Sequence, residues 1–461
     1  MYHRAPKTRT PTDSGTKTIS APLVIPRDQH TISRANISPN ALKVLYRLRA
    51  AGYEAHLVGG GVRDLLLGRE PKDFDVATDA LPEQVREVFR NCRLIGRRFR
   101  LAHVHFGREI VEVATFRAGH DTVDEGESAD SNHQNDEGML LRDNVYGNIE
   151  QDALRRDFSI NALYYNIADF SIVDYAGGMA DLEAGVLRLL GDPETRYRED
   201  PVRMLRAVRF AAKLGFRLSP ETEAPIAELA PLLAEVPAAR LFDEVLKMFL
   251  AGTAVSCFEK LRQYGLFAQL FPETEARLAS LEHEFPLTLV LKGLENTDLR
   301  VRADKPVTPA FLFGVLLWEP VRHLAHQLQA EGESPTSAIQ RAGGRLVAQQ
   351  VERVALPRRF STPMQEIWGL QPRFLHTRGK RPQRLLAHPR FRAAYDFLLL
   401  RAESGEADPE LATWWTSMQA SGAGEGEGEV PPPLPEAEAE PRKRRSRRGG
   451  RRRRRPQPES D

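Results

Sequence analysis

Cysteine is nearly absent from this chain of 461 residues, which contains only Cys92 and Cys257. Neither belongs to a CxxC motif or stands in a histidine-rich stretch, so we expect buried small residues rather than metal ligands in a cytoplasmic protein. The chain also lacks any apolar run close to the roughly 20 residues that span a membrane. Residues 1–35 have no apolar core of a secretory signal, and their Thr, Pro, Ser and Arg content predicts disorder.

The charge is nearly balanced in total but unevenly distributed. Residues 441–461 contain 11 of the 65 lysines and arginines, and the linker 421–440 contains six glutamates among Gly and Pro. Residues 1–420 balance 54 basic against 55 acidic residues. We therefore expect a near-neutral folded part, followed by a disordered acidic linker and an arginine-rich tail. Such a tail attracts polyanions through counterion release, so nucleic acid is the expected partner, with an acidic protein or no role in activity as alternatives.

Secondary-structure signals divide the folded part into a mixed front and a helical remainder. Alternating apolar residues predict strands, and periodic apolar faces predict helices. The expected strands are 53–58, 72–78, 101–107, 109–116 and 170–178, and the expected helices of the front are 38–52, 62–68, 81–90 and 151–166. The acidic stretch 119–138 reads as a surface loop. Helix signals dominate from Asp200 onward, which predicts an α+β head of about 160 residues and an all-helical remainder.

The segment LVGGGVRDLLLGREPKDFDVAT (57–78) has the clearest chemical signal. Its glycines follow an expected strand and precede an expected helix, which is typical of a phosphate-binding turn. No Gly-Lys-Ser/Thr follows, so it is not a P-loop, and Asp64 stands where a dinucleotide fingerprint needs its third glycine. We expect backbone amides and the charge of Arg63 to face a triphosphate, although the turn alone also fits a tight turn with a surface arginine.

Asp73 and Asp75 add a metal-binding signal to this turn. Residues i and i+2 of a strand point to the same face, so both carboxylates are expected to converge while Phe74 turns to the core. Two close negative charges are unfavourable unless a cation neutralises them. Mg²⁺ is bound by one or two carboxylates together with substrate phosphates and water. Asp73 and Asp75 are therefore the predicted ligands of Mg²⁺.

These residues and three further motifs resemble the class II branch of the polymerase-beta-like nucleotidyltransferases, which contains bacterial poly(A) polymerases and CCA-adding enzymes. The further motifs are RRDFSINAL (155–163), DYAGGMADLEAGVLR (174–188) and EDPVRMLRAVRFAAKLGF (199–216). The resemblance implies an α+β fold, with a polymerase-beta-like nucleotidyltransferase head followed by all-helical neck, body and C-terminal domains. We place the disordered N-terminal segment at 1–35, the catalytic head at 36–195, a helical nucleotide-recognition and RNA-binding region at 196–300, a helical C-terminal RNA-binding domain at 301–418, and the linker and tail at 419–461.

The resemblance also implies catalytic roles. Asp73 and Asp75 would hold the Mg²⁺ that activates the RNA 3′-hydroxyl while pyrophosphate leaves. Asp157 of the RRDF motif would be the third catalytic carboxylate, and Glu112 on the neighbouring expected strand is its geometric rival. The residues that would contact the triphosphate or ribose are Gly60, Arg63 and Arg156.

The motif at 199–216 would choose the base. On one helix, Asp200, Arg203 and Arg206 would share a face with Arg209 behind them, and all four are assigned to nucleotide binding. Asp200 only accepts hydrogen bonds and Arg203 only donates them, so the pair suits adenine and cytosine and opposes uracil and guanine. It does not separate A from C. A set of surface ion pairs is the alternative reading of these charges.

Segments outside the shared motifs are similar to the poly(A) polymerase I group, namely 82–117, 191–210, 380–403 and the arginine-rich C-terminus. The resemblance implies a Mg²⁺-dependent polynucleotide adenylyltransferase that adds AMP from ATP to RNA 3′ ends without a template and promotes RNA decay. A tRNA CCA-adding nucleotidyltransferase is the alternative, and a non-catalytic RNA-binding relative is disfavoured because the expected site residues are present. The expected partners are ATP, RNA 3′ ends, RNA-decay machinery and an RNA chaperone, and we expect a monomer.

RNA contacts without sequence preference are expected from basic segments within 300–403, such as 353–360 and 373–384. Three tryptophans in this part of the chain could stack on bases. Isolated tryptophans at helical spacing are more often core residues, and we predict a core position for Trp368, Trp414 and Trp415.

Overall fold

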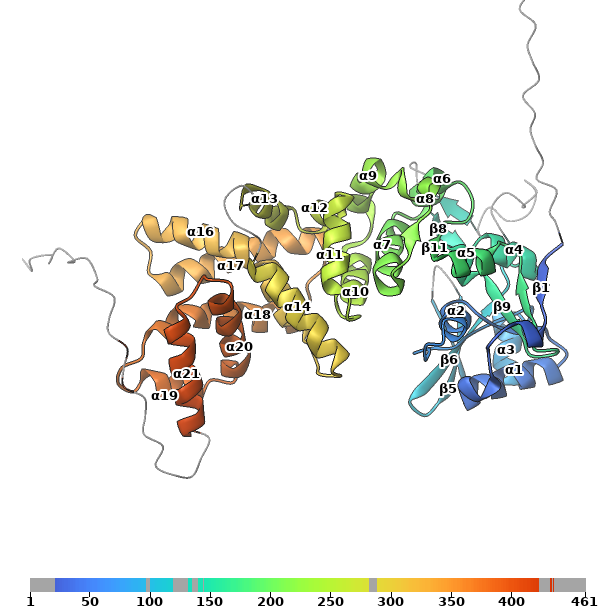
Figure 1. Cartoon of the computed structure of the whole chain (residues 1–461), viewed down its shortest axis with the longest axis horizontal. Coiled ribbons are helices and arrows are strands. Elements are labelled where there is room, and N and C mark those ends of the chain that lie inside the picture. The colour runs from blue at the N-terminus through green and yellow to red at the C-terminus, as the bar shows by residue number, and fades with distance from the viewer. Residues whose placement is uncertain are drawn as a thin grey trace, which may run out of the picture. The chain divides into compact units, whose positions relative to one another are not determined.

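The computed structural model describes residues 21–96, 100–118, 132–134, 140–143, 145–281 and 288–422, together with Pro432 and Leu434. The predicted tail 441–461, nearly all of the acidic linker and most of the acidic stretch 119–138 lie outside the described residues. The chain forms two compact units, Met1–Gln365 and Glu366–Asp461. Figure 1 labels their elements.

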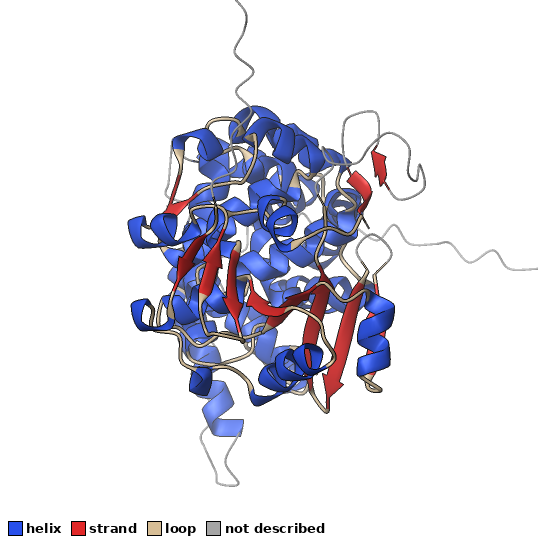
Figure 2. Ribbon diagram, turned by 90° about the vertical axis from the view of Figure 1, so that its right-hand side faces the viewer, coloured by secondary structure: helices blue, strands red, loops and turns tan. Residues whose placement is uncertain are grey.

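An eight-stranded sheet forms the core of the head in the first unit (Figure 2), in the order β1-β10-β9-β2-β3-β6-β5-β4. All neighbouring strands are antiparallel except β3 and β6, which run parallel and therefore need a crossover connection. That connection contains helix α3 and strands β4 and β5. The strand bounds are β1 Leu23–Ile25, β2 Ala55–Val58, β3 Asp75–Thr78, β4 Cys92–Ile95, β5 Leu101–Phe106, β6 Glu109–Thr115, β9 Leu163–Asn166 and β10 Ile172–Asp174.

The first three helices of the head form close to the predicted positions 38–52, 62–68 and 81–90. Helix α1 (Pro39–Ala50) begins at Ser38, whose side chain accepts hydrogen bonds from the amides of Asn40 and Ala41. It buries Ala41, Val44, Leu45 and Leu48, the apolar stripe expected of an amphipathic helix. The other helices of the head are α2 Gly60–Leu66, α3 Pro82–Val88, α4 Ile149–Leu154 and α5 Gly178–Ala184.

The predicted helix 151–166 is wrong. Helix α4 ends at Leu154, a 3₁₀ turn covers Ser159–Asn161, and residues 163–166 form strand β9 between β2 and β10. Tyr164 and Tyr165 are neighbours in sequence and are both fully buried. A strand covered on both faces has a continuous apolar run, which periodicity alone does not distinguish from a buried helix.

The predicted disorder of residues 1–35 is also wrong for its last part. Strand β1 pairs with β10, with Leu23 opposite Asp174, and two 3₁₀ turns follow at Arg27–Gln29 and Arg34–Asn36. Ile25 and Ile32 are buried. These two isoleucines fix the segment to the head, and the polar composition of the whole stretch conceals them.

Helices make up most of the chain after residue 192. In the first unit they are α6 Pro193–Glu199, α7 Val202–Leu214, α8 Pro220–Glu223, α9 Ile226–Leu229, α10 Ala238–Phe249, α11 Ala254–Gln263, α12 Leu266–Leu270, α13 Pro272–Leu281, α14 Thr288–Arg302, α15 Pro309–Leu316, α16 Trp318–Ala330 and α17 Pro335–Arg353. Helix α18 (Arg358–Leu370) leads into the second unit. The expected boundaries at 195/196 and 300/301 fall inside α6 and α14, so the helical regions are not divided there. No helix among the described residues has the length and apolar content to span a membrane.

The second unit has an aromatic core. It contains helices α19 Arg381–Leu386, α20 Phe391–Glu403 and α21 Pro409–Gly422. The Trp415 ring lies 5.1 Å from Phe374 and 5.7 Å from Phe391, and its indole N–H donates to the Phe374 carbonyl oxygen at 2.9 Å. Trp368, Trp414 and Trp415 are all buried, so their predicted core positions are confirmed.

Replacing Trp415 should therefore unfold the second unit more readily. We expect Trp415→Ala to lower the free energy of unfolding by about 3–5 kcal/mol, because it leaves a large cavity and an unpaired carbonyl. Urea-induced unfolding measures the change. Thr413→Ala, at an exposed position on the same helix, is the control and should change stability by less than about 0.5 kcal/mol. Equal effects of the two substitutions would contradict the assigned core.

Candidate active site

The glycine turn after β2 forms as predicted between a strand and a helix. Gly59 has φ 76° and ψ −139°, a conformation that side-chain-bearing residues rarely adopt. A Cβ atom on Gly59 would lie 3.8 Å from both the Asp75 Oδ2 atom and the Arg156 Nη1 atom. The turn thus places bare backbone between a carboxylate and a guanidinium. Helix α2 begins at the next residue, and the first amides of a helix have no partner within it.

Two strands bring carboxylates together beside this turn. Asp75 is the first residue of β3 and lies opposite Glu112 in the parallel register with β6. Burial, the nearby Glu112 carboxylate and Asp73 raise the pKa of Asp75 to about 6, against the opposing effect of Arg156. Glu112 and Asp73 are therefore close enough to Asp75 for their negative charges to disfavour its ionised form.

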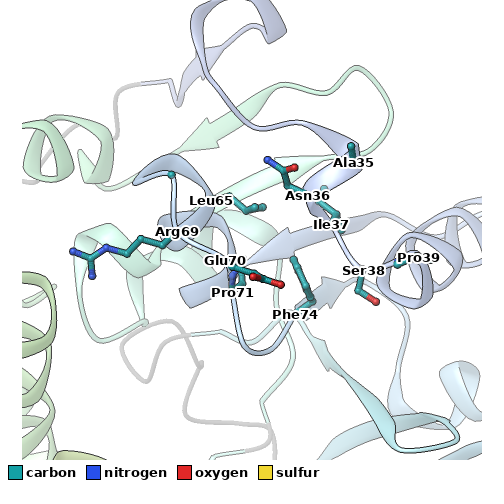
Figure 3. Close-up of a pocket in the computed structure, with 11 residues that line it drawn as sticks. Ala35, Asn36, Ile37, Ser38, Pro39, Leu65, Arg69, Glu70, Pro71 and Phe74 are labelled. Atoms are coloured by element: carbon teal, nitrogen blue, oxygen red, sulfur yellow. The ribbon is translucent and has the colours of Figure 1, made fainter. Parts of the chain in front are cut away.

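The sequence pattern predicted that Asp73 lies on the same strand as Asp75, and this prediction is wrong. The pairing of β2 with β3 ends at Val58 and Asp75, because the chain turns away from β2 at Gly59. Asp73 therefore lies in the exposed loop before β3. Phe74 does not enter the core fully and lines a cavity of about 510 Å³ formed with residues 35–39, Leu65 and 68–71 (Figure 3). None of the predicted site residues lines that cavity.

Asp157 occupies a different environment from Asp75. Arg206 donates to its Oδ2 atom at 2.8 Å through Nε, and the Asn161 side chain and the Phe158 amide donate to its Oδ1 atom at 3.1 and 2.8 Å. Burial by itself would raise the pKa of Asp157, but Arg206 and these hydrogen bonds hold it well below its usual range. Both oxygens are thus already engaged within the protein. Glu112, the rival, lies opposite Asp75 in the register of β3 with β6, and its Oε1 atom is 3.1 Å from the His103 Nε2 atom.

The donor set at β3 and β6 fits a hard divalent cation. Carboxylate oxygens are the ligands that Mg²⁺ prefers, and an acidic group with an elevated pKa gains most from a neighbouring cation. Among the described residues, no cluster of three or more His, Cys, Asp or Glu side chains is preformed for a metal. Mg²⁺ does not require a preformed cluster of three protein ligands, because in proteins it is often bound by one or two carboxylates together with substrate phosphates.

Arg63 does not point outward as expected for a triphosphate contact. Its side chain is 97 % buried and donates to the Asp64 Oδ1 atom at 2.8 and 2.7 Å and to the Asn161 Oδ1 atom at 2.7 Å. The guanidinium also lies 5.1 Å from the centre of the Phe210 ring. Arg63 therefore connects α2 to the 3₁₀ turn and to α7. A buried arginine needs such partners, and the local motif alone does not specify them.

Arg156 is oriented toward the glycine turn. Its Nε atom donates to the Tyr164 hydroxyl at 2.8 Å and its Nη2 atom donates to the Asp152 carboxylate at 2.8 Å. These bonds fix the guanidinium, and within the described residues its Nη1 atom makes no hydrogen bond. That atom faces the Gly59 turn, 3.8 Å from the position of an added Cβ atom. Of the predicted triphosphate contacts, Arg156 has the most suitable orientation.

The four predicted base-reading residues do not share one helix. Asp200 ends α6 in an extended conformation, because the following Pro201 disfavours the helical conformation at Asp200, and α7 begins at Val202. Arg203 donates to the Arg196 carbonyl at 2.6 Å and to Glu199 at 2.8 Å. Arg206 binds Asp157, as described above, and Arg209 lies 3.7 Å from Glu244.

Arg240 is a residue of this site that the sequence reasoning missed. From helix α10 it donates to both oxygens of Asp200, at 2.8 and 2.6 Å. This bidentate geometry fixes the orientation of the carboxylate. Arg240 stands 40 positions after Asp200 on a helix with an ordinary amphipathic pattern, so no local motif marks it.

Family models match three parts of the chain: the poly A polymerase head domain at 55–188, the probable RNA and SrmB-binding site of polymerase A at 215–278, and the polymerase A arginine-rich C-terminus at 331–455. The chain is 54 % identical over 401 residues to poly(A) polymerase I of Salmonella typhi, covering 86 % of each. It is 51 % identical over 402 residues to poly(A) polymerase I of Haemophilus influenzae, covering 86 % of this chain and 88 % of that one.

Similarity to CCA-adding enzymes is lower and shorter in sequence. The chain is 38 % identical over 230 residues to the CCA-adding enzyme of Bacillus subtilis, covering 50 % of this chain and 55 % of that one. Among solved structures, the CCA-adding enzyme of Bacillus stearothermophilus in complex with CTP is similar with a TM-score of 0.55 and 26 % identity, covering 84 % of this chain and 83 % of that one. The similarity in fold to a CCA-adding enzyme thus extends over 84 % of the chain, whereas the sequence similarity to the CCA-adding enzyme of Bacillus subtilis covers 50 %.

The ion pair of Asp157 with Arg206 leads to a prediction about stability and pH. Arg206→Gln should lower the free energy of unfolding by about 1–3 kcal/mol at neutral pH, because it leaves a largely buried carboxylate without its cation. The folded-state pKa of Asp157 is below the unfolded value of about 3.9, so the pair stabilises the fold above that value and the effect is lost as the pH falls through the folded-state pKa. Urea-induced unfolding of both proteins at neutral and acidic pH should show a difference that narrows below about pH 4. A difference independent of pH would contradict this account.

Proposed function

The chain belongs to the bacterial poly(A) polymerase I family, and we propose that Asp75, Asp73 and Glu112 hold the Mg²⁺ used in its reaction. The enzyme is a polynucleotide adenylyltransferase, which adds AMP from ATP to RNA 3′ ends without a template and releases pyrophosphate. The observation that supports the metal assignment is the register of β3 with β6, which sets Asp75 opposite Glu112. Mg²⁺ bound there would help to deprotonate the RNA 3′-hydroxyl and would neutralise charge on the reacting phosphates.

The protein groups around the glycine turn are proposed to orient the triphosphate. The amides that follow Gly59 provide donors without side chains in the way, and the Arg156 Nη1 atom provides a fixed positive charge. Gly60 packs against the Arg63 guanidinium, since a Cβ atom there would lie 3.4 Å from the Arg63 Nη2 atom. Arg63 would then act on the substrate through the position of this turn. Its own donors are engaged with Asp64 and Asn161.

Base selection is proposed to depend on Asp200 and Arg203. Asp200 would accept a hydrogen bond from the adenine amino group, while Arg203 would donate to the adjacent ring nitrogen. Each Asp200 oxygen has two lone pairs, so the carboxylate can accept from the base and from Arg240 together. Arg240 fixes the direction of the carboxylate, and Glu199 and the Arg196 carbonyl restrain Arg203. Arg206 and Arg209 would support the pocket through Asp157 and Glu244.

We also propose a cellular setting for this activity. The enzyme would act in the cytoplasm as a monomer, in mRNA polyadenylation that leads to RNA decay. RNA-decay machinery and an RNA chaperone would be its protein partners. The match of 215–278 to a probable RNA and SrmB-binding site of polymerase A supports a protein contact in the helical region.

Primer extension with single nucleotides tests the reaction. The protein with Mg²⁺ should extend a short primer unrelated to tRNA into a long ladder with ATP alone, and much less with CTP, GTP or UTP. A tRNA that lacks its CCA end is the comparison substrate. Addition that stops after a few nucleotides, requires CTP and occurs only on the tRNA would instead identify a CCA-adding activity. Absence of extension on both RNAs would contradict catalysis by this chain.

Substitutions of the acidic group test the metal assignment. Asp75→Asn should reduce the rate of extension by at least about 1,000-fold, because the transition state loses a metal ligand. Glu112→Gln should lower kcat more than Asp157→Asn does, while Asp157→Asn should mainly lower the melting temperature. The measurements are initial rates at saturating ATP and RNA, together with thermal unfolding.

Glu87→Gln is the matched control for these substitutions. It removes one exposed carboxylate from helix α3 of the same head and should leave the rate unchanged. Normal activity of a folded Asp75→Asn protein would refute the metal site. A greater loss of kcat from Asp157→Asn than from Glu112→Gln would restore Asp157 as the third carboxylate.

A further inference from the structure

The second unit contains a cavity with an unusual concentration of positive charge. Its volume is about 270 Å³, and it is lined by Arg373, His376, Arg381, Arg384 and Leu385. Arg373 belongs to the 3₁₀ turn Gln371–Leu375, and the other two arginines belong to α19. No acidic residue lines this cavity, and the surrounding segment 371–392 contains seven arginines and lysines without one aspartate or glutamate.

The three arginines of the cavity differ from their neighbours in having no counter-charge. Within the described residues, the guanidinium groups of Arg373, Arg381 and Arg384 make no ion pair and no hydrogen bond. Nearby, Arg390 pairs with Glu366 at 2.8 Å and Arg392 pairs with Asp396 at 3.1 Å. Like charges gathered in one cavity repel each other. A bound polyanion would relieve that repulsion, so the cavity is suited to a ligand with several negative charges.

The backbone that supports the arginines is rigid. Phe374 and Leu385 are buried beneath them, and the Phe374 carbonyl accepts the Trp415 indole N–H. At the start of the turn, the Gln371 side-chain amide donates to the carbonyls of Ile367 and Ala394, at 3.1 and 3.0 Å. The backbone positions from which the arginines extend are therefore set before any ligand arrives. Preorganisation of this kind lowers the entropy cost of binding.

An apolar side chain beside the cavity indicates what kind of polyanion would bind. Leu375, which ends the same turn, is 66 % exposed, the highest value among the large apolar residues of the described part. A bare inorganic anion gains nothing from such a surface. A nucleic-acid strand has bases and riboses that can cover it while its phosphates meet the arginines.

We propose that Arg373, Arg381 and Arg384 form an anchoring site for the backbone phosphates of single-stranded RNA, upstream of the 3′ end that is extended. This inference rests on the proposed function, since it takes RNA as the substrate. The site reads phosphates and no base edges, so it accepts any sequence. A second contact on the same RNA raises the effective concentration of the 3′ end at the catalytic head and lowers the RNA concentration that the enzyme needs.

The test compares two full-length variants that lose the same charge. One carries Arg373→Gln, Arg381→Gln and Arg384→Gln. The control carries Arg49→Gln, Arg90→Gln and Arg108→Gln, three exposed positions of the head in the first unit, outside this cavity. The probe is a fluorescent 30-nucleotide oligo(A), whose Kd is measured by anisotropy over a range of salt concentrations. Thermal unfolding and the KM for ATP show whether each variant is folded and has an intact nucleotide site.

The cavity variant should bind the probe at least about 10-fold more weakly than the control variant at low salt. Its plot of log Kd against log salt should be less steep by about 2, because three phosphate contacts are lost at about 0.7 each. Its KM for ATP should match that of the unchanged protein. Equal Kd values and slopes for the two variants would refute the site, provided that the unchanged protein extends RNA. Failure of the unchanged protein to extend any RNA would instead refute the proposed function.

Discussion

The parallel pairing of β3 with β6 is the constraint on which the site depends. It sets Asp75 and Glu112 side by side at the start of β3, where two carboxylates repel each other and the Asp75 pKa is raised. The repulsion between the two carboxylates is an electrostatic cost to the fold, although the Glu112 Oε1 atom lies 3.1 Å from the His103 Nε2 atom. The other features of the head reduce that cost or make use of it. Gly59 keeps the space beside Asp75 free of a side chain, and the positive charge of Arg156 lowers the Asp75 pKa against the carboxylates.

The arginines around the site serve mainly to fix its parts. Arg206 joins α7 to Asp157 of the head, and Arg240 joins α10 to Asp200. Arg63 joins α2 to Asn161. Each of these pairs connects segments far apart in the sequence, and each is largely removed from water, where ionic hydrogen bonds hold a defined geometry. The region proposed to bind the nucleotide is therefore held together by two ion pairs, Arg206–Asp157 and Arg240–Asp200, and by the hydrogen bond from Arg63 to Asn161.

The spacing of neighbouring residues predicted part of this site. It did not predict the contacts that residues far apart in the sequence make in the folded protein. The strand–turn–helix at 55–66 follows from a few neighbouring residues, so its pattern was sufficient, whereas the strand position predicted for Asp73 was wrong because β3 begins at Asp75. The partners of Arg63, Asp157 and Asp200 depend on tertiary contacts between residues up to 98 positions apart. The strand at Leu163–Asn166 was missed because its burial on both faces removes the alternation that identifies a strand. The segment around Ile25 and Ile32 was wrongly predicted to be disordered. Its composition is polar overall, but these two buried residues fix it to the head.

The two proposed sites would divide recognition between the units by chemical type. In the first unit, the proposed base-reading pair is one carboxylate and one guanidinium, each held in direction by its protein partners. The second unit contains a cavity lined by three arginines that have no counter-charge among the described residues, and the site proposed there would recognise charge and no base. A polymerase without a template needs this separation, because the incoming nucleotide must be chosen while the growing strand must be accepted whatever its sequence. Uniform phosphate contacts also let the strand shift by one nucleotide after each addition, since every position of the backbone offers the same ligand.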